Sequence, residues 1–353
     1  MSRLLFISIL ILLGAKVNAQ GPLPCGKPKI NMEALKIAEA YMARTQQPTA
    51  VNRLVRVYFH IFKDNDGTNA AATLAQVQNE FNQLVADYAP NSLCFAYMGI
   101  DSINNTMINN SLNPDVPSNV AWLNPFLIPG CINIFYHAGL IGYGGNAFAI
   151  PNTFCSIGRG NLNLWRTTSH EVGHCMGLNH TFETAFGLEN INGNNCGTAG
   201  DRVCDTPADP WSFRGSNACF SNVGCSYGGT CTDGNGSNLY NPPFTNIMSY
   251  WGVVGCNLTL FSGGQYSRVN GFLDTNAGLM ATTSDFSGYY GPATVSSGVI
   301  MRSSITLLST TGTVILTGSV NASFQARSVT INAGFRATPT SGRIIIRPAN
   351  CNY

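Results

Sequence analysis

Apolar positions follow strand spacing and helix spacing in turn along the first 180 residues. Residues 55–62 form a continuous β-branched and aromatic run, which is typical of a buried strand. Over residues 70–88 the apolar side chains recur every three or four positions and predict an amphipathic helix. A further helix is expected over residues 31–44, and strands over residues 94–101 and 131–137. This order predicts an α/β sheet covered by helices.

The pattern changes in the second half of the chain. Residues 185–245 are rich in Gly, Asn and Cys with little periodicity, and predict a long disulfide-bound irregular region. Ser262 and Gln265 have the spacing of a capping box and predict a last helix that ends near residue 273. From about residue 285, short β-branched runs separated by Gly, Ser and Asn predict a small all-β module. Its expected strands include residues 306–308, 314–316, 329–331 and 343–346.

The N-terminus has the features of a signal peptide. Arg3 precedes an apolar run over residues 4–13, and small residues at 17–19 predict cleavage before Gln20. Ten apolar residues are too few to cross a hydrocarbon core, which needs about 20. A buried strand or an uncleaved anchor is the alternative. Residues 1–19 therefore predict a secreted, extracellular protein.

Composition adds two constraints. Charged residues make up only 10% of the chain and the net charge is +2, so there is no broad basic field for nucleic acid. The chain has 12 cysteines, which predict disulfides in an oxidising compartment.

Three of the five histidines fall within eleven residues, in the pattern His170-Glu171-x-x-His174-x-x-Gly177-x-x-His180. On a helix, His170 and His174 project from one face and can bind the same Zn²⁺. Gly177 can adopt a positive φ, which ends the helix and brings His180 round as third ligand. Three protein ligands leave a fourth position for water, which is typical of catalytic zinc, whereas structural zinc has four. Glu171 is placed to act on the zinc-bound water as general base.

The same residues also have a structural interpretation. Glu171 has capping-box spacing from Thr168, and the histidines would then be hydrogen-bonded core residues. Gly177 and His180 at their positions favour the metal site over this alternative.

The extended motif resembles the metzincin clan of zinc endopeptidases. Asn246-Ile247-Met248-Ser249-Tyr250 is similar to the Met-turn of that clan. Strings at residues 180–182 (HTF), 200–207 (GDRVCDTP) and 261–268 (FSGGQYSR) resemble the pappalysin-like (cytophagalysin) family. The resemblance is dense from residue 170 to 268, weaker over 53–169, and absent after about 285.

The resemblance implies a secreted zinc-dependent metalloendopeptidase made as a zymogen. Residues 20–52 would be a pro-segment, and residues 53–284 an α/β metzincin-like catalytic domain. That domain would have a twisted mixed sheet, an active-site helix and a disulfide-rich irregular C-terminal subdomain. Residues 285–353 would be the small all-β C-terminal module.

Several roles follow from the resemblance. Tyr250 would stabilise the oxyanion or act as a switchable ligand, with a buried aromatic residue as the alternative. Met248 would lie beneath the metal without binding it. Asp201, with the backbone around Thr206, would contribute to a structural Ca²⁺ site, although a turn-capping aspartate is an equal alternative.

The resemblance also bears on the cysteines. A Cys25 thiolate would occupy the fourth zinc position and keep the zymogen inactive, and an ordinary disulfide is the rival interpretation. Cys175 is expected to be buried and unpaired. Pairing in relatives suggests that Cys196 and Cys256 each bond to a member of the group Cys219, Cys225 and Cys231.

The expected substrates are protein or peptide segments in extended conformation. Residues 141–150 would form an exposed strand at the rim of the cleft and pair with a peptide by β-augmentation. Some members of the family that this chain resembles use an acid shortly after the Met-turn to prefer a basic residue after the scissile bond. Residues 251–255 of this chain contain no acid, so we expect an apolar S1′ pocket and hydrophobic residues after the scissile bond.

The alternative function is a catalytically inert secreted binding or adhesion protein on the same scaffold. A surface or another protein would then be the partner of the β module. The presence of Glu171 and Tyr250 favours the enzyme.

Overall fold

The computed structural model describes residues 23–45, 52–213, 225–232, 239–283 and 285–348. Its central element is a five-stranded sheet in the order β3-β2-β4-β7-β5. The first four strands are parallel, and β5 is antiparallel to β7, so the sheet is mixed as expected. The strands are β2 (Arg53–Lys63), β3 (Leu93–Asn104), β4 (Ile132–His137), β5 (Gly145–Asn146) and β7 (Phe154–Gly158).

Helices pack on this sheet and carry the site. Helix α2 starts at a capping box of Thr73 and Gln76, and α6 starts at the predicted capping box of Ser262 and Gln265. Each box satisfies backbone N–H groups that the first turn of a helix leaves unpaired. The helices are α1 (Met32–Thr45), α2 (Leu74–Tyr88), α3 (Thr106–Ser111), α4 (Pro117–Val120), α5 (Thr167–Cys175), α6 (Gly263–Thr275) and α7 (Ala277–Met280).

The main core joins the sheet to α5. Phe59 of β2, Tyr136 of β4 and Val172 of α5 are each 0% exposed and belong to one apolar cluster. The Tyr88 hydroxyl at the end of α2 donates to the carbonyl of Ser169 at 2.9 Å. Helix α5 is therefore fixed on both sides, by apolar packing and by a buried hydrogen bond.

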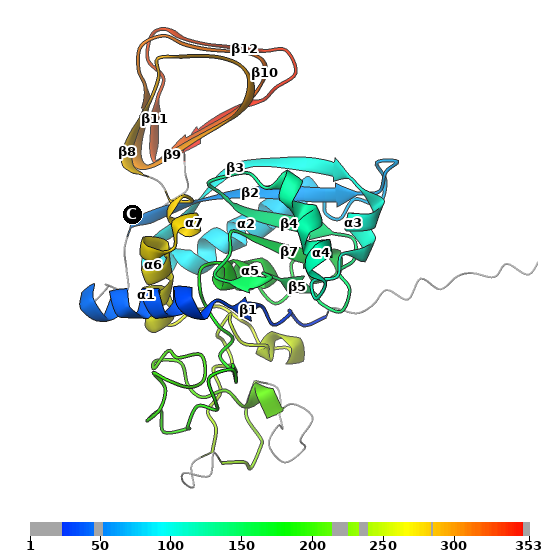
Figure 1. Cartoon of the computed structure of the whole chain (residues 1–353), viewed down its shortest axis with the longest axis vertical. Coiled ribbons are helices and arrows are strands. Elements are labelled where there is room, and N and C mark those ends of the chain that lie inside the picture. Colours follow the sequence, from blue (N-terminus) through cyan, green and yellow to red (C-terminus); the bar gives the residue numbers. More distant parts are fainter. Residues whose placement is uncertain (1–22, 46–51, 214–224, 233–238, 284, 349–353) are drawn as a thin grey trace, which may run out of the picture.

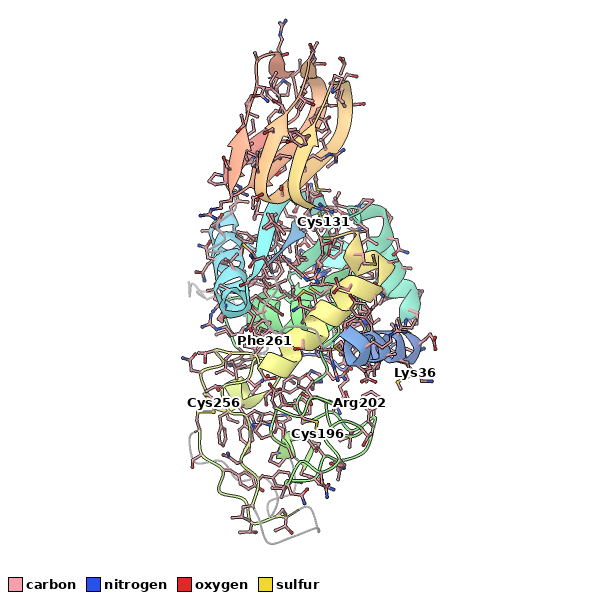
Figure 2. All side chains as sticks on the ribbon, turned by 90° about the vertical axis from the view of Figure 1, so that its left-hand side faces the viewer. Lys36, Cys131, Cys196, Arg202, Cys256 and Phe261 are labelled. Atoms are coloured by element: carbon pink, nitrogen blue, oxygen red, sulfur yellow. A yellow bond between two sulfur atoms is a disulfide. The ribbon has the colours of Figure 1, made fainter. Side chains whose placement is uncertain are left out.

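The irregular region lies at one end of the molecule and is held by disulfides (Figure 1, Figure 2). Cys225 bonds to Cys256, as the resemblance implies. Cys196 bonds to Cys204, so the expected bond from Cys196 to the later group is wrong. The two cysteines are 8 residues apart on a compact turn, which brings their Cα atoms within 4.9 Å. Cys219 lies outside the described residues.

The β module is a parallel coil at the opposite end of the molecule (Figure 1). Successive turns of the chain stack in register, so that Val314 pairs with Ala293 on one side and Phe335 on the other. Two of the predicted short runs, residues 306–308 and 314–316, are parts of the longer strands β9 and β10, which continue through the bends of the coil. The runs at 329–331 and 343–346 correspond to the short strands β11 and β13. The strands are β8 (Asp285–Tyr290), β9 (Ala293–Thr310), β10 (Val314–Ala326), β11 (Ser328–Thr330), β12 (Phe335–Pro339) and β13 (Ile344–Pro348).

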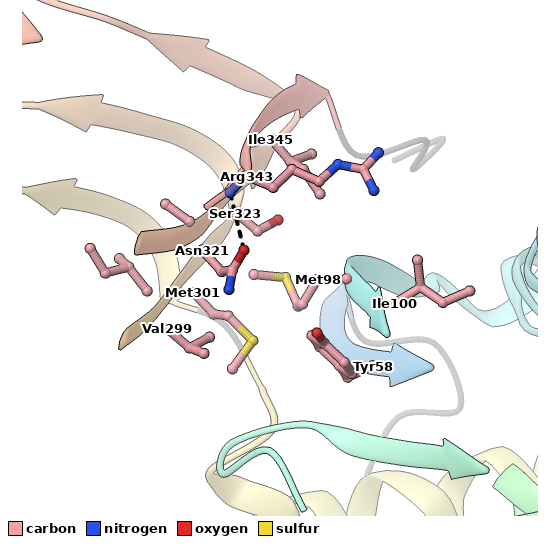
Figure 3. A pocket seen from close by; sticks show the side chains of 12 residues that line it. Tyr58, Met98, Ile100, Val299, Met301, Asn321, Ser323, Arg343 and Ile345 are labelled. Atoms are coloured by element: carbon pink, nitrogen blue, oxygen red, sulfur yellow. Dashed lines mark hydrogen bonds between the residues drawn. The ribbon is translucent and has the colours of Figure 1, made fainter. Parts of the chain in front are cut away.

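The β module rests against β3, the edge strand of the central sheet. The Arg347 guanidinium lies 4.4 Å from the centre of the Tyr97 ring and donates to the Tyr97 carbonyl at 3.3 Å. Figure 3 shows a pocket at this junction, with Tyr58 and Met98 facing Met301. The module thereby covers part of an edge that would otherwise expose backbone groups.

Within the described part of the chain, no helix is both long and apolar enough to cross a membrane. The predicted signal peptide, residues 1–19, lies outside the described residues.

Candidate active site

Helix α5 carries His170, Glu171 and His174, and every residue of the helix is buried. The helix begins after Arg166, whose φ is 57°, and has no side-chain cap. Thr168 lies inside the helix and not at its N-cap, so the predicted alternative of a Thr168–Glu171 capping box is not formed.

Gly177 ends this helix in the way the motif predicts. Its φ is +96°, a conformation that other residues rarely adopt, and a Cβ there would collide with the ring of Phe272. The chain then turns back and places the Nε2 atom of His180 at 3.0 Å from that of His174 and 3.1 Å from that of His170. The three predicted histidines therefore meet at one point.

The protonation of these rings suits a metal. The Nδ1 atoms of His170 and His174 each donate to a backbone carbonyl at 2.7 Å, those of Ile247 and Leu178. Burial lowers the pKa of His170 to about 4, and burial also lowers the pKa of His174 and His180. Neutral rings with the proton on Nδ1 turn their Nε2 lone pairs toward one another, which is unfavourable without a cation. Their spacing fits one Zn²⁺ with Zn–N distances of about 2.0–2.1 Å.

Glu171 is placed beside the three histidines and is fully buried. Burial raises its pKa to about 8, and the neighbouring Cys25 thiol partly opposes that rise. Neither carboxylate oxygen has a hydrogen bond of ordinary geometry in the described part of the chain. Gly145 gives this side chain room, because a Cβ there would lie 2.6 Å from its Oε1 atom.

The Met-turn supports the site from the other side. Met248 packs against α5 at Gly173, where a Cβ would come within 2.7 Å of the Met248 sulfur. The Tyr250 ring centre lies 4.8 Å from that of His180 and 5.7 Å from that of His170. Tyr250 is thus a buried aromatic residue whose ring packs beside two of the three histidines.

Cys25 reaches the same cluster from the N-terminal segment (residues 23–45). Its sulfur lies within 4.8 Å of ligand atoms of His170 and Glu171. Cys25 is a free thiol, so the alternative of an ordinary disulfide is wrong. Burial, and then the charge of Glu171, raise the pKa of the thiol, so its thiolate form requires a nearby cation. Cys175 is free and buried, as expected, and lies beside another free thiol, Cys155.

The N-terminal segment also covers the predicted cleft rim. Its strand β1 (Lys29–Ile30) pairs in parallel with β6 (Ala149–Ile150). Before it, the Gly26 N–H donates to the Gly145 carbonyl at 2.8 Å. The rim was expected to be one exposed strand over residues 141–150. It is instead divided between β5 and β6, and Gly145 and Asn146 are buried beneath this segment.

Asp201 and Thr206 lie together in a buried turn. Asp201 accepts from the Val203 N–H at 2.9 Å and from the Thr206 hydroxyl at 3.0 Å, which is the geometry of a capped turn. Burial raises the pKa of Asp201 to about 7. Glu189 lies in no motif and was not predicted; its pKa is raised to about 8 by burial and then by the charge of Asp201.

Asp209 was missed because no motif marks it. It accepts hydrogen bonds from the Thr181 and Ser249 hydroxyls at 2.6 and 2.7 Å, and from the Trp251 indole at 3.1 Å. These partners follow His180, Met248 and Tyr250 directly in the chain. Asp209 therefore ties the loop of the third histidine to the Met-turn.

A cavity beside His170 is lined in part by Gly252 and Val253, from the segment for which the sequence predicts an apolar S1′ pocket. No acidic side chain is among the residues that line it. One side of this cavity is lined by Trp165, Thr167, Gly252, Val253 and Leu258. Pro24 and Cys25 of the N-terminal segment line the other side.

Three converging imidazoles beside a buried carboxylate are the arrangement of a metallopeptidase site. Residues 158–274 match the model of the peptidase M43 family, described as pregnancy-associated plasma protein-A. This segment contains the whole histidine motif and the Met-turn, so the match supports a metalloprotease domain around the site.

Relatives with the same activity in their names match over most of this chain. An extracellular metalloprotease of Colletotrichum graminicola is 28% identical over 291 residues, which cover 76% of this chain and 96% of the relative. One from Podospora anserina is 25% identical over 281 residues, covering 70% and 88%. Their names support a protease of the metal-dependent class and agree with the extracellular location predicted for this chain.

Proposed function

We propose that this protein is a secreted zinc metalloendopeptidase that hydrolyses peptide bonds in extended segments of proteins. The observation that carries the proposal is the meeting of three neutral histidine Nε2 atoms, 3.0 and 3.1 Å apart, beside the free carboxylate of Glu171. We place the protein among the cytophagalysins on the strings at residues 180–182, 200–207 and 261–268.

His170, His174 and His180 would hold the ion. When bound, Zn²⁺ lowers the pKa of a water toward about 7 and polarises the scissile carbonyl. Glu171 takes a proton from the attacking water and passes it to the leaving amine.

Tyr250 donates a hydrogen bond to the oxygen on which negative charge develops. The support for this role is its hydroxyl, which already donates to a peptide carbonyl, that of Cys25. Met248 packs beneath the helix and binds no metal.

Residues 20–52 act as a pro-segment in this proposal. Cys25 is the fourth zinc ligand of the zymogen, supported by its distance from His170 and Glu171. The backbone pairing of β1 with β6 holds the segment in the cleft. Cleavage before Arg53 would release the segment. Because Cys25→Ser removes the proposed fourth ligand, the full-length variant should show measurable activity.

The apolar wall of Trp165, Val253 and Leu258 supports a preference for hydrophobic residues at S1′. New N-termini from a digest of an unfolded protein, identified by mass spectrometry, should begin mostly with apolar residues. A majority of Lys or Arg at that position would overturn the preference.

We also propose a structural Ca²⁺ at Asp201 and the backbone around Thr206. The support is Glu189, which is buried beside Asp201 and has an oxygen without a partner in the described residues. Carboxylate and carbonyl oxygens are the ligands that Ca²⁺ prefers. Calcium should raise the thermal midpoint of unfolding, and Asp201→Asn should abolish that rise. An equal rise in both proteins would contradict the site.

Casein digestion by the matured protein, with and without a zinc chelator and beside Glu171→Ala, tests the main proposal. We expect cleavage only by the zinc-loaded wild type. Cleavage that survives the chelator or the substitution would overturn it. A folded, zinc-loaded protein that cleaves nothing would favour the inert binding protein.

A further inference from the structure

Asn161 holds the backbone of the N-terminal segment with both ends of its side chain. It closes a short 3₁₀ helix, Arg159–Asn161, directly after β7. Its Nδ2 donates to the Leu23 carbonyl at 2.8 Å, and its Oδ1 accepts from the Leu23 N–H at 3.2 Å. Asn161 is only 2% exposed, so this amide is buried where it meets the N-terminal segment.

The geometry of an extended chain explains why one amide can make both contacts. The N–H and C=O of a single residue in a strand point to the same edge, where a neighbouring strand exchanges two hydrogen bonds with them. The side-chain amide of Asn161 offers the same donor and acceptor pair. The Asn161 side chain therefore takes the place of one residue of a partner strand. It binds only the backbone of Leu23, so the contact does not depend on the side chain at that position.

We propose that Asn161 is a substrate-binding residue, which grips the N–H and C=O of one residue of an extended substrate once the N-terminal segment has left. The inference rests on the proposed protease function. Leu23 lies two residues before Cys25, whose carbonyl meets Tyr250 and whose sulfur lies beside Glu171. The Asn161 contact is thus close to the reacting groups.

Gly144 lets the backbone of the N-terminal segment lie close to Asn161. The Gly144 N–H donates to the Pro24 carbonyl at 2.9 Å, and a Cβ at Gly144 would collide with the Leu23 carbonyl and with Asn161. Departure of the segment leaves the Asn161 amide without its peptide partner, and so without two hydrogen bonds. A substrate of either chain direction restores both bonds, since a half-turn of the amide exchanges its donor and acceptor.

The first test compares KM and kcat of the matured wild type, Asn161→Ala, and the control Asn79→Ala on a peptide long enough to fill the cleft. Asn79 is an exposed asparagine on α2, so it controls for the loss of an amide. We expect Asn161→Ala to raise KM about tenfold, the effect of two lost hydrogen bonds, with kcat nearly unchanged. An unchanged KM would overturn the proposal.

A scan of N-methylated peptides separates contact from a structural effect. Methylation removes one backbone N–H at a time from the substrate. At one position it should weaken binding to the wild type and add nothing in Asn161→Ala, because the partner is already gone. Equal penalties at every position in both proteins would contradict the proposal.

A binding measurement keeps this inference distinct from the proposed function. If the matured wild type cleaves no peptide, the protease proposal fails by itself. Calorimetry of a synthetic peptide of residues 20–45 with the same proteins then decides the role of Asn161. We expect about tenfold weaker binding to Asn161→Ala, and equal affinity or no binding to either protein would overturn the proposal.

Discussion

The proposed catalytic region (residues 53–284) and the β module differ in how many ionisable side chains they contain and bury. Residues 53–284 carry 14 acidic and 8 basic residues, and several ionisable side chains are buried, among them Glu171 and Asp209. Residues 285–353 contain five arginines, one acid at the first position (Asp285) and no histidine. The core of the module is apolar, with Leu316, Val320 and Phe324 each 0% exposed.

The backbone conformation is also less regular around the site than in the β module. Around the site, Trp165 and Arg166 have positive φ values of 52° and 57°, which side chains tolerate only under constraint from their surroundings. The β module repeats one coil in register. The proposed chemistry thus lies in the region that has buried ionisable groups and positive φ values beside helix α5, while the β module supplies packing and surface. Changes in one region should leave the property carried by the other intact.

The largest expected effect is on catalysis. Glu171→Gln should lower kcat/KM on an extended peptide by about 10²–10⁴-fold, because it removes the proposed general base. The fold should persist, since no described hydrogen bond depends on this carboxylate. Glu80→Gln, another buried carboxyl group, is the matched control and should retain activity. Similar losses in both variants would show that burial of charge, and not chemistry, was disturbed.

The β module should respond to a different change. Phe324→Ala removes a fully buried ring from its core and should lower the free energy of unfolding of the module by about 3–5 kcal/mol. Denaturant unfolding followed by circular dichroism measures this loss. The kcat/KM of the matured enzyme should stay within a factor of two or so under conditions where the module remains folded. A proportional loss of activity would contradict the separation of the two regions.

Acid sensitivity should come from the catalytic region. Burial lowers the pKa of His137 to about 4, and the ring is held by the Ile108 carbonyl and Ser156. Between pH 6.5 and 4, His137 is protonated in the unfolded chain but stays neutral in the folded protein. The free energy of unfolding therefore falls as the pH falls from 6.5 to 4. The loss is about 3 kcal/mol.

His137→Gln should remove that part of the pH dependence, as measured by chemical unfolding at pH 7 and pH 4.5. Glu171, Glu189 and Asp201 have raised pKa values and change stability in the opposite direction, so the comparison is between variant and wild type. Identical pH profiles would sink this assignment.

The smallest expected effect is at the junction of the two regions. Arg347→Ala removes the contact with the Tyr97 ring and should cost about 0.5–1 kcal/mol, since the guanidinium is only partly buried. Arg336→Ala, an exposed arginine of the same module, is the control. Thermal unfolding measures both, and an equal shift would show that the junction contributes nothing specific.

The elements with strong local patterns were predictable from the sequence. The capping box at Ser262 and the bend at Gly177 depend on neighbouring residues and appear where they were expected. The helix predicted over residues 70–88 also forms, and begins at Leu74. The meeting of His170, His174 and His180 follows from helix spacing plus one turn. Short-range periodicity therefore predicted the meeting of the three histidines.

The remaining features depend on contacts between distant segments. Asn161 meets Leu23 across 138 residues, and Asp209 meets Ser249 across 40, and neither has a motif. The Cys196–Cys204 bond follows from the path of an irregular loop. The cleft rim was expected to be exposed, but the N-terminal segment, which is distant in the sequence, covers it. Sequence periodicity carries no signal for such tertiary contacts.

The central claim is that three histidines hold one catalytic zinc ion. The most direct test strips the matured protein with a chelator, adds back Zn²⁺ in steps, and follows bound zinc and peptide cleavage together. We predict that cleavage is absent in the stripped protein and rises in proportion to bound zinc, up to about one ion per chain. Full cleavage by the stripped protein, or none after one zinc has bound, would contradict the account.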